Sequence, residues 1–360
     1  ILGISPAQVR VAGPRSPGRT PRAPRESAEH QPGRMPRPLA PLATSLPTIL
    51  TVPEGREAGL SRARLRAPDL APVGHGLRMS RDVEATWTDY LRAVQSLNPS
   101  GVFSHATAAR IWGMWIPGRL LEDPRVHLAK ERGRGGRTSR PGLVMHQLQP
   151  DAPVIEYRGL RLTAPAWTWV DLAHHLSVED LVVAGDSLLP SPHGAEARRL
   201  GHLPARATTV EQMRRLAHAR KNVRGIVRAR AVLDLLRTGA DSPPESRLRH
   251  RLHEAGFPEP QVNPPIRLSS GETVRVDLAW EELRLCLEFD GDQHRTDRAQ
   301  WQRDRARRRG LEADDWAVTW VAGEVFTRGG WPRFVGDLSR LMRRQATRRG
   351  AVLPPGLPGE

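Results

Sequence analysis

The chain has 360 residues, and its 55 lysine and arginine residues outnumber 39 aspartate and glutamate residues, which gives a formal net charge of +16. Its single cysteine, Cys286, excludes an intramolecular disulfide and a zinc cluster built from thiolates, and the sequence has no run of about 18 apolar residues that would predict a membrane span. Because a surplus of positive charge favours binding to polyanions, we expect DNA as the partner, with RNA as second choice. We also expect no membrane association and a cytoplasmic location.

Residues 1–78 are crowded with proline, arginine, glycine and alanine, as in Pro-Arg-Ser-Pro-Gly-Arg at 14–19. Proline interrupts helices and strand ladders, and the segment has too little periodic apolar content to offset the entropy of ordering. The composition therefore predicts a disordered tail over 1–78. Its arginines either add non-specific affinity for nucleic acid or have no specific function.

Residues 79–238 have the pattern of a helix-rich α+β domain. Amphipathic periodicity predicts helices at 83–97, 104–113, 163–176, 178–189, 210–219 and 224–236. Two short predicted strands, 124–128 and 142–146, flank a basic loop at 132–137. This order is compatible with a winged-helix-like module that binds nucleic acid or another partner.

The histidines and tryptophans of this domain invite functional interpretations. The histidines are His105, His127, His146, His174 and His175. Their spacing fits no compact set of metal ligands, and two adjacent histidines face different directions on a helix, so we expect structural or surface roles. We expect four tryptophans in the core rather than stacked on bases, namely Trp112, Trp115, Trp167 and Trp169.

A break rich in turn-forming residues at 238–244 precedes a third domain, predicted over 243–348 and followed by a flexible tail at 349–360. The predicted elements are a helix at 245–255, strands at 262–268, 274–280 and 283–290, a helix at 297–313, a strand at 316–321 and a helix at 334–344. This order of helices and strands predicts an α/β fold, arranged as a sandwich.

The second and third of these strands form a predicted hairpin. If Glu281 and Glu282 make the turn, Asp277 lies opposite Cys286, and Glu288 lies diagonally beside Asp277, with Cβ atoms roughly 7–8 Å apart. Asp290 joins the two acids on one face, and the core residues share the other: Val274, Val276, Leu278, Leu283, Leu285, Leu287 and Phe289. Because gathered carboxylates repel one another, the pattern predicts a site for Mg²⁺ or Mn²⁺, which suits phosphodiester hydrolysis.

The motifs of this domain follow one another in a recognisable order. They are Glu245 at the start of a helix, Arg275-Val276-Asp277, Leu287-Glu288-Phe289-Asp290-Gly291-Asp292-Gln293-His294, Arg303-Asp304-xx-Arg307 and Trp316-Ala317-Val318. This order resembles bacterial endonuclease domains related to very-short-patch-repair endonucleases, in the PD-(D/E)XK restriction-endonuclease-like superfamily, over about the last third of the chain. The resemblance implies DNA hydrolysis, with Asp277 and Glu288 as metal ligands and Glu245 as a further acid.

One position departs from the superfamily pattern. The motif ends in lysine, whereas this sequence has Asp290 there, which we retain as a catalytic candidate, and its two lysines, Lys130 and Lys221, lie outside the domain. Relatives that lack the lysine use histidine, so the resemblance makes His294 the candidate for orienting or deprotonating the attacking water. The candidates for contact with the substrate are Arg275, Arg303, Asp304 and Arg307.

The preceding domain has its own motifs: Ser104-His105-xx-Ala108-Ala109, Val126-His127, His146 and the segment 162–173. They resemble the N-terminal regions of the same nuclease-like proteins and of AbiEi-type antitoxins of abortive-infection systems. This resemblance implies DNA binding in which Arg132, Arg134 and Arg137 contact phosphates. The alternative is a flexible surface loop that its charge keeps soluble.

Two functions follow from these patterns. The first is a metal-dependent endonuclease that cleaves DNA, or RNA as second choice, through the acids of the hairpin. The second is a non-catalytic DNA-binding regulator, similar to an antitoxin-like repressor, with a degenerate nuclease domain. The second gains support if the acids after residue 287 are only a solvated strand end and a turn.

Overall fold

The computed structural model describes residues 42, 46–131, 141–192, 208–289 and 298–358, without the side chains at 298–304. The chain forms two compact units. The first consists of Ile1–Val102, Leu128–Gln149 and Ile155–Leu162, and the second of Phe103–His127, Pro150–Val154 and Thr163–Glu360. In the described part, no helix combines the length and the apolar character needed to cross a membrane.

The first unit begins with a three-stranded antiparallel sheet in the order β1-β3-β2. Its elements are β1 (Ile49–Thr51), helix α1 (Val52–Glu57), the 3-10 helix η1 (Arg64–Arg66), β2 (Leu70–Gly74) and β3 (Leu77–Ser80). Thr51 and Glu54 form a capping box that fixes the start of α1. Three leucines make a small core, namely Leu50, Leu65 and Leu70.

This sheet contradicts the expectation of a disordered tail over the whole of 1–78. The expectation is wrong from Ile49 onward, where strands and buried side chains begin. Composition averaged over a long segment hides short apolar stretches such as Ile49-Leu50, which gain their partners only through long-range strand pairing.

A helix and a larger sheet follow. Thr86 and Asp89 cap helix α2 (Trp87–Leu97), and the sheet has the strand order β6-β5-β4-β8-β7. The strands are β4 (Val102–Phe103), β5 (Val126–Lys130), β6 (Leu143–Gln147), β7 (Val154–Tyr157) and β8 (Leu160–Thr163). The basic loop at 132–137 lies outside the described residues, so the winged-helix interpretation stays a prediction.

The helices of the second unit follow the predicted order. They are α3 (His105–Trp112), α4 (Gly118–Leu121), α5 (Pro165–Leu172), α6 (Val178–Asp186), α8 (Val210–Ala219), α9 (Ile226–Val232) and the 3-10 helix η2 (Leu233–Leu235). Trp112, Trp167 and Trp169 are buried as predicted, whereas Trp115 is only partly buried. The indole N–H of Trp169 donates to the carbonyl of Leu181 at 2.9 Å, which satisfies its polar atom inside the core.

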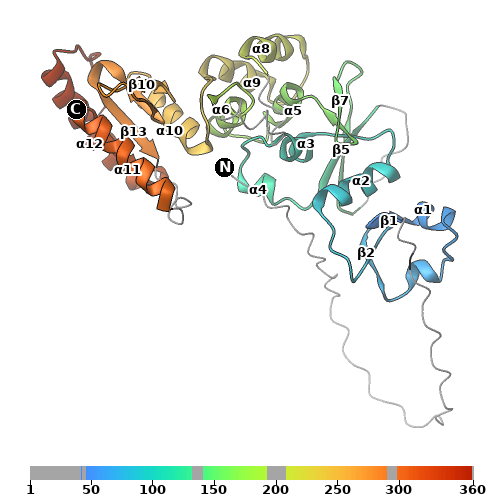
Figure 1. The fold of residues 1–360 in the computed structure, drawn as a ribbon. Helices are drawn as coiled ribbons and strands as arrows, with labels where there is room; N and C mark the ends of the chain where they lie inside the picture. Colours follow the sequence, from blue (N-terminus) through green and yellow to red (C-terminus); the bar gives the residue numbers. More distant parts are fainter. Residues whose placement is uncertain (1–41, 43–45, 132–140, 193–207, 290–297, 359–360) are drawn as a thin grey trace, which may run out of the picture. The chain divides into compact units, whose positions relative to one another are not determined.

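The C-terminal part of this unit contains a four-stranded sheet in the order β14-β13-β12-β9 (Figure 1). Strands β13 and β14 run parallel, and the other neighbours run antiparallel. The elements are α10 (Pro243–Glu254), β9 (Gln261–Val262), β10 (Pro265–Arg267), β11 (Thr273–Arg275), β12 (Leu278–Trp280), the 3-10 helix η3 (Glu281–Leu283), β13 (Leu285–Phe289), α11 (Arg298–Ala313), β14 (Ala317–Val321), the 3-10 helix η5 (Gly323–Phe326) and α12 (Gly330–Arg349). Strands β10 and β11 pair separately from this sheet.

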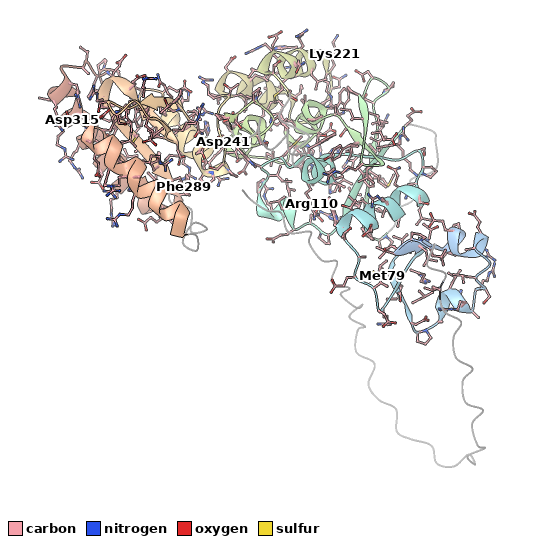
Figure 2. The ribbon with its side chains drawn as sticks, in the orientation of Figure 1. Met79, Arg110, Lys221, Asp241, Phe289 and Asp315 are labelled. Atoms are coloured by element: carbon pink, nitrogen blue, oxygen red, sulfur yellow. The ribbon has the colours of Figure 1, made fainter. Side chains whose placement is uncertain are left out.

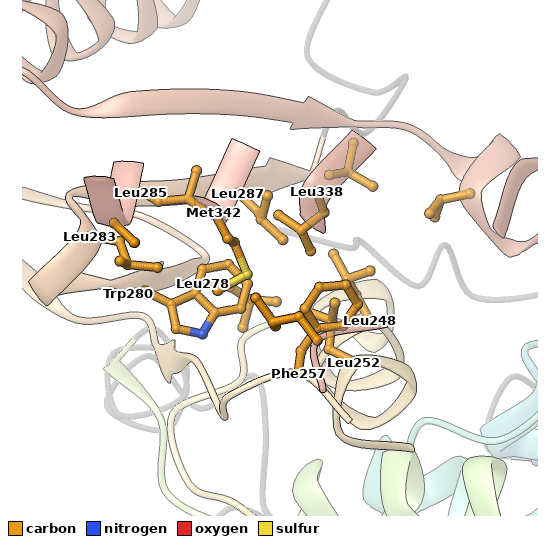
Figure 3. Close-up of a cluster of buried hydrophobic side chains, with 14 residues drawn as sticks. Leu248, Leu252, Phe257, Leu278, Trp280, Leu283, Leu285, Leu287, Leu338 and Met342 are labelled. Carbon is orange, nitrogen blue, oxygen red and sulfur yellow. The ribbon is translucent and has the colours of Figure 1, made fainter. Parts of the chain in front are cut away.

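Each face of this sheet has its own hydrophobic core. On one face Leu287 belongs to a cluster with Leu252 of α10 and Met342 of α12 (Figure 3). On the other face Cys286 belongs to a cluster with Leu311 of α11. Helices therefore cover both faces, and the predicted α/β class is confirmed.

The hairpin register differs from the prediction by two residues. Leu278 pairs with Leu287, so the expected pairing of Asp277 with Cys286 is wrong. The connection is longer than the predicted two-residue turn, because η3 is followed by Arg284 in the left-handed conformation, with φ of 43°. A shift of two residues leaves each side chain of β12 and β13 on its predicted face.

The face predicted for Val274 and Val276 is wrong. Both pack in the cluster of Cys286 instead of sharing the core of Leu278. The chain bends at Asp277 between β11 and β12, so the two-residue alternation does not continue through the bend.

The flexible tail predicted at 349–360 is wrong as far as the described residues extend. Helix α12 ends with Gly350 in the left-handed conformation, with φ of 65°. The chain then packs back onto the helix, because Leu357 is 5% exposed in the first cluster and the hydroxyl of Ser339 donates to the carbonyl of Pro358.

A buried ion pair joins α10 to α6. Asp186 and Arg249 have side chains that are 0% and 2% exposed, with 3.1 Å between Oδ2 and Nη2. The hydroxyl of Ser246 and the backbone N–H of Arg237 also donate to the Asp186 carboxylate, at 2.5 and 2.8 Å. Arg249 reaches Glu259 at 3.2 Å as well, so both buried charges are compensated.

A second group of ion pairs lies along the same helix contact. Arg247 of α10 approaches Glu179 of α6 at 2.9 Å, and Arg251 pairs with the same carboxylate. These contacts explain why Thr163–Glu360 belong to one compact unit, although the composition predicted a domain boundary near 238–243.

Removal of one partner from the buried pair tests this attachment. We expect Asp186→Ala to lower the free energy of unfolding by about 3 kcal/mol, because it leaves the Arg249 guanidinium buried without its main countercharge. The double variant Asp186→Leu with Arg249→Met replaces both charges by apolar groups and should recover most of that loss. Urea unfolding measures both values, and a loss below about 1 kcal/mol for Asp186→Ala would contradict this account.

Candidate active site

Asp277 and Glu288 flank the paired ends of two neighbouring strands. Leu278 of β12 pairs with Leu287 of β13; Asp277 lies in the bend before Leu278, and Glu288 follows Leu287. The backbone N–H of Phe289, labelled in Figure 2, donates to Oδ2 of Asp277 at 2.7 Å. This bond aims the Asp277 side chain across the ladder toward the strand that carries Glu288.

Glu245 reaches the same region from the first turn of α10. Its carboxylate accepts hydrogen bonds from the N–H of Asp241 at 3.0 Å, the hydroxyl of Ser242 at 2.6 Å and the side-chain amide of Asn263 at 2.6 Å. Ser242 also caps the helix, in the S-x-x-E pattern of a helix start. Burial, and then the carboxylate of Asp277, raise the pKa of Glu245 to about 7.

Asn263 connects these acids, and the sequence analysis did not identify it. Its backbone N–H donates to the carbonyl of Asp277 at 2.9 Å, while its side chain donates to Glu245 and to the carbonyl of Gly239. Its φ of 48° is left-handed, a conformation that asparagine tolerates better than most residues. Asn263-Pro264 is a turn signal in the sequence, but it does not indicate contact with an acid.

Glu288 is 3% exposed and forms an ion pair with Arg307 of α11, with 2.9 Å between Oε2 and Nη2. The other amine of Arg307 donates to the carbonyl of Arg275 at 3.0 Å. The guanidinium of Arg275 in turn donates to the carbonyl of Asn263 at 2.8 Å. Of the predicted substrate-binding arginines, Arg307 lies beside Glu288, and Arg275 and Arg307 both donate to backbone carbonyls.

The acids create a negative field inside the sheet. Burial, Glu288 and Asp277 raise the pKa of the Cys286 thiol to about 12, although Arg307 acts in the opposite direction. A cation close to Asp277 and Glu288 would therefore be stabilised. The donors are carboxylate oxygens, which suit a hard divalent ion such as Mg²⁺, and such an ion commonly needs only one or two protein carboxylates beside water and phosphate.

The structure does not describe the side chains of the remaining predicted site residues. Asp290 and His294 lie outside the described residues. Arg303 and Asp304 lie within α11, but their side chains are not described. Among the described residues, no group of three or more histidine, cysteine, aspartate or glutamate side chains has a metal-binding arrangement.

Several histidines lie close together in the structure, although their spacing in the sequence did not predict this. The ring centroids of His105 and His127 are 6.0 Å apart, those of His105 and His175 are 6.3 Å apart, and those of His174 and His175 are 3.5 Å apart. The adjacent pair His174 and His175 thus does not face in different directions. Burial and then the neighbouring His174 lower the pKa of His175 to about 4, so this ring is neutral at pH 7.

Comparisons with known proteins give relatives whose names carry no function. No family model matches the chain. Two proteins of Mycobacterium tuberculosis, called uncharacterized protein MT2308 and uncharacterized protein Rv2248, are each 29% identical over 177 residues. The match covers 49% of this chain and 60% of each relative, so the chain spans about three fifths of their length.

One solved structure is also similar to part of the chain. It is the crystal structure of the RV2827C protein from Mycobacterium tuberculosis, with 18% identity and a TM-score of 0.33. The alignment covers 52% of this chain and 72% of that protein. A function for this chain can therefore be inferred only from its own residues.

The raised pKa of Glu245 predicts a pH-dependent stability difference. A glutamate whose pKa rises from 4.5 to about 7 on folding stabilises the protein fully below pH 4.5, and this contribution is lost as the pH rises through about 7. Wild type should therefore lose about 3 kcal/mol relative to Glu245→Gln across that interval. Urea unfolding of both proteins as a function of pH measures the difference.

Glu272→Gln is the control for this experiment, because Glu272 is an exposed glutamate of the same part of the chain. Its unfolding free energy should follow that of wild type at each pH. A constant difference between wild type and Glu245→Gln would show that Glu245 does not have the expected environment.

Proposed function

We propose that the C-terminal part of the chain is a metal-dependent endonuclease that hydrolyses phosphodiester bonds in DNA. The observation that carries the proposal is the proximity of the three acids: Asp277 raises the pKa of Glu245, and Glu288 and Asp277 add to the raised pKa of Cys286. Groups with perturbed pKa values gather at functional sites, so this arrangement favours a functional site over a solvated strand end.

In this proposal Asp277 and Glu288 would hold Mg²⁺ or Mn²⁺. Such an ion, when bound, would supply a lowered pKa for a water molecule and a shield for the charge on the phosphate. Glu245, whose pKa lies near 7, can accept or release a proton close to neutral pH. His294 is the further candidate for the proton of the attacking water, and Asp290 occupies the position of the superfamily lysine.

The arginines of α11 support nucleic acid as the substrate. Arg307 lies beside Glu288, and Arg303 precedes it by one helical turn. Arg305, Arg308 and Arg309 are exposed, and with about 3.6 residues per turn they lie on a different side of the helix from Arg307. These arginines can neutralise phosphates, and the net charge of +16 attracts a polyanion from a distance. We propose DNA before RNA, and a cytoplasmic location.

A second candidate function is a DNA-binding regulator, similar to an antitoxin-like repressor, without catalytic activity. It is favoured by Asp290 at the position where the superfamily has lysine and by the ion pair that engages Glu288 with Arg307. In this alternative the residues before 239 supply a nucleic-acid-binding or partner-binding module, and the C-terminal acids have structural roles alone.

Plasmid nicking separates the two functions. We expect the full chain to nick supercoiled DNA in Mg²⁺ or Mn²⁺ and to stop in excess chelator. Asp277→Asn and Glu288→Gln should each lower the rate by at least about 100-fold, since even the loss of a group outside the metal's ligands commonly lowers activity roughly 10- to 100-fold.

Glu282→Gln is the matched control, because Glu282 is an exposed acid in the turn between the same two strands. It should nick at the wild-type rate. DNA binding by wild type without metal-dependent nicking would refute the endonuclease and favour the regulator.

A further inference from the structure

We propose that Arg307 is an exchangeable countercation: it neutralises Glu288 in the metal-free protein, and a divalent cation displaces it so that its guanidinium can bind the phosphate of the substrate. This inference rests on the proposed function, because it concerns the same acids. Beyond that function, we infer that Arg307 couples the binding of the metal to the binding of the phosphate.

Glu288 is buried. Its side chain is 4% exposed, and a carboxylate so far from water requires a cation or hydrogen-bond donors. Arg307 supplies one, with Nη2 at 2.9 Å from Oε2. The arginine thus occupies a position beside the same carboxylate oxygens that the proposed metal would use.

The two partners differ in their access to solvent. The side chain of Arg307 is 30% exposed, against 4% for Glu288, so the guanidinium can leave toward water while the carboxylate stays in place. The second bond of Arg307 goes to the carbonyl of Arg275, an exposed residue at the end of β11.

Metal and arginine compete for one carboxylate. A Mg²⁺ ion contacts its oxygen ligands at about 2.0–2.1 Å, and a second positive group held against the same carboxylate would be repelled. A phosphate oxygen is an alternative acceptor for the displaced guanidinium, which binds phosphate in a bidentate manner. The bond from Phe289 to Asp277 keeps the neighbouring acid aimed at the site during this exchange.

Coupling of this kind is reciprocal. If the metal releases Arg307 for the phosphate, then phosphate binding must strengthen metal binding by the same factor. The exposed arginines of α11 would bring the backbone close to Arg307 before the exchange. The chain would then assemble its metal site fully only when nucleic acid is present.

Metal affinity of arginine variants tests the proposal without relying on activity. Titration calorimetry with Mn²⁺ on the full chain should give a Kd about tenfold lower for Arg307→Met than for wild type, within the roughly 5- to 150-fold range typical of coupled sites. Arg307→Met should also melt at a lower temperature than wild type without metal and gain more in melting temperature from saturating Mn²⁺.

Two further proteins complete the test. Arg348→Met removes an arginine whose ion pair with Asp315 measures 2.8 Å, outside the site, and should bind Mn²⁺ with wild-type affinity. Adding Glu288→Gln to Arg307→Met should abolish the gain in affinity, because the freed carboxylate is then absent. Nicking by Arg307→Met should have a lower kcat than wild type, since the phosphate loses its guanidinium.

The outcomes separate this inference from the proposed function. If wild type nicks DNA but Arg307→Met binds Mn²⁺ no more tightly than wild type, the exchange is refuted and the endonuclease survives. If Arg307→Met binds Mn²⁺ more tightly and wild type does not nick in any metal, the exchange stands and the endonuclease fails. If neither protein binds Mn²⁺, both are refuted.

Discussion

A carboxylate buried beside a sheet must meet positive charge or hydrogen-bond donors, and this requirement organises the C-terminal part of the chain. Glu288 meets Arg307, Asp277 meets a backbone N–H, and Glu245 meets three donors at the start of α10. These donors belong to different elements, so the acids can converge only when the sheet and its helices are assembled. The pKa of Cys286 is raised first by burial; the carboxylates of Glu288 and Asp277 add to this effect, and Arg307 opposes it.

The compensation of buried charge also fixes the helices that precede this sheet. Asp186 of α6 is buried against Arg249 and Ser246 of α10, and Glu245 lies next to Ser246 in the sequence. The helix that carries Glu245 is thus fixed by a partner from outside residues 243–348. The orientation of Glu245 therefore depends on the contact between α10 and α6. A comparison limited to the last third of the chain would not include this contact.

The sequence predicted the elements and the faces of this region better than its pairings. Alternation of apolar and polar residues put Asp277 and Glu288 on one face, and this placement stays a prediction because the bend at Asp277 interrupts the alternation. The register was wrong, since it depends on the left-handed Arg284 that lengthens the connection. The contacts of Asn263 and of Asp186 join residues far apart in the chain, and no local pattern predicts such pairs.

The connection between β12 and β13 also bears on how related chains diverge. Trp280 pairs with Leu285, so four residues, 281–284, separate the two strands. A deletion of two of them would keep every apolar residue of β13 on its own side of the sheet, yet would slide Glu288 past Asp277. A descendant could thereby lose the juxtaposition of its acids while it retained all of them, together with its fold. The spacing between the acids, and not their presence, is what should be compared among homologues.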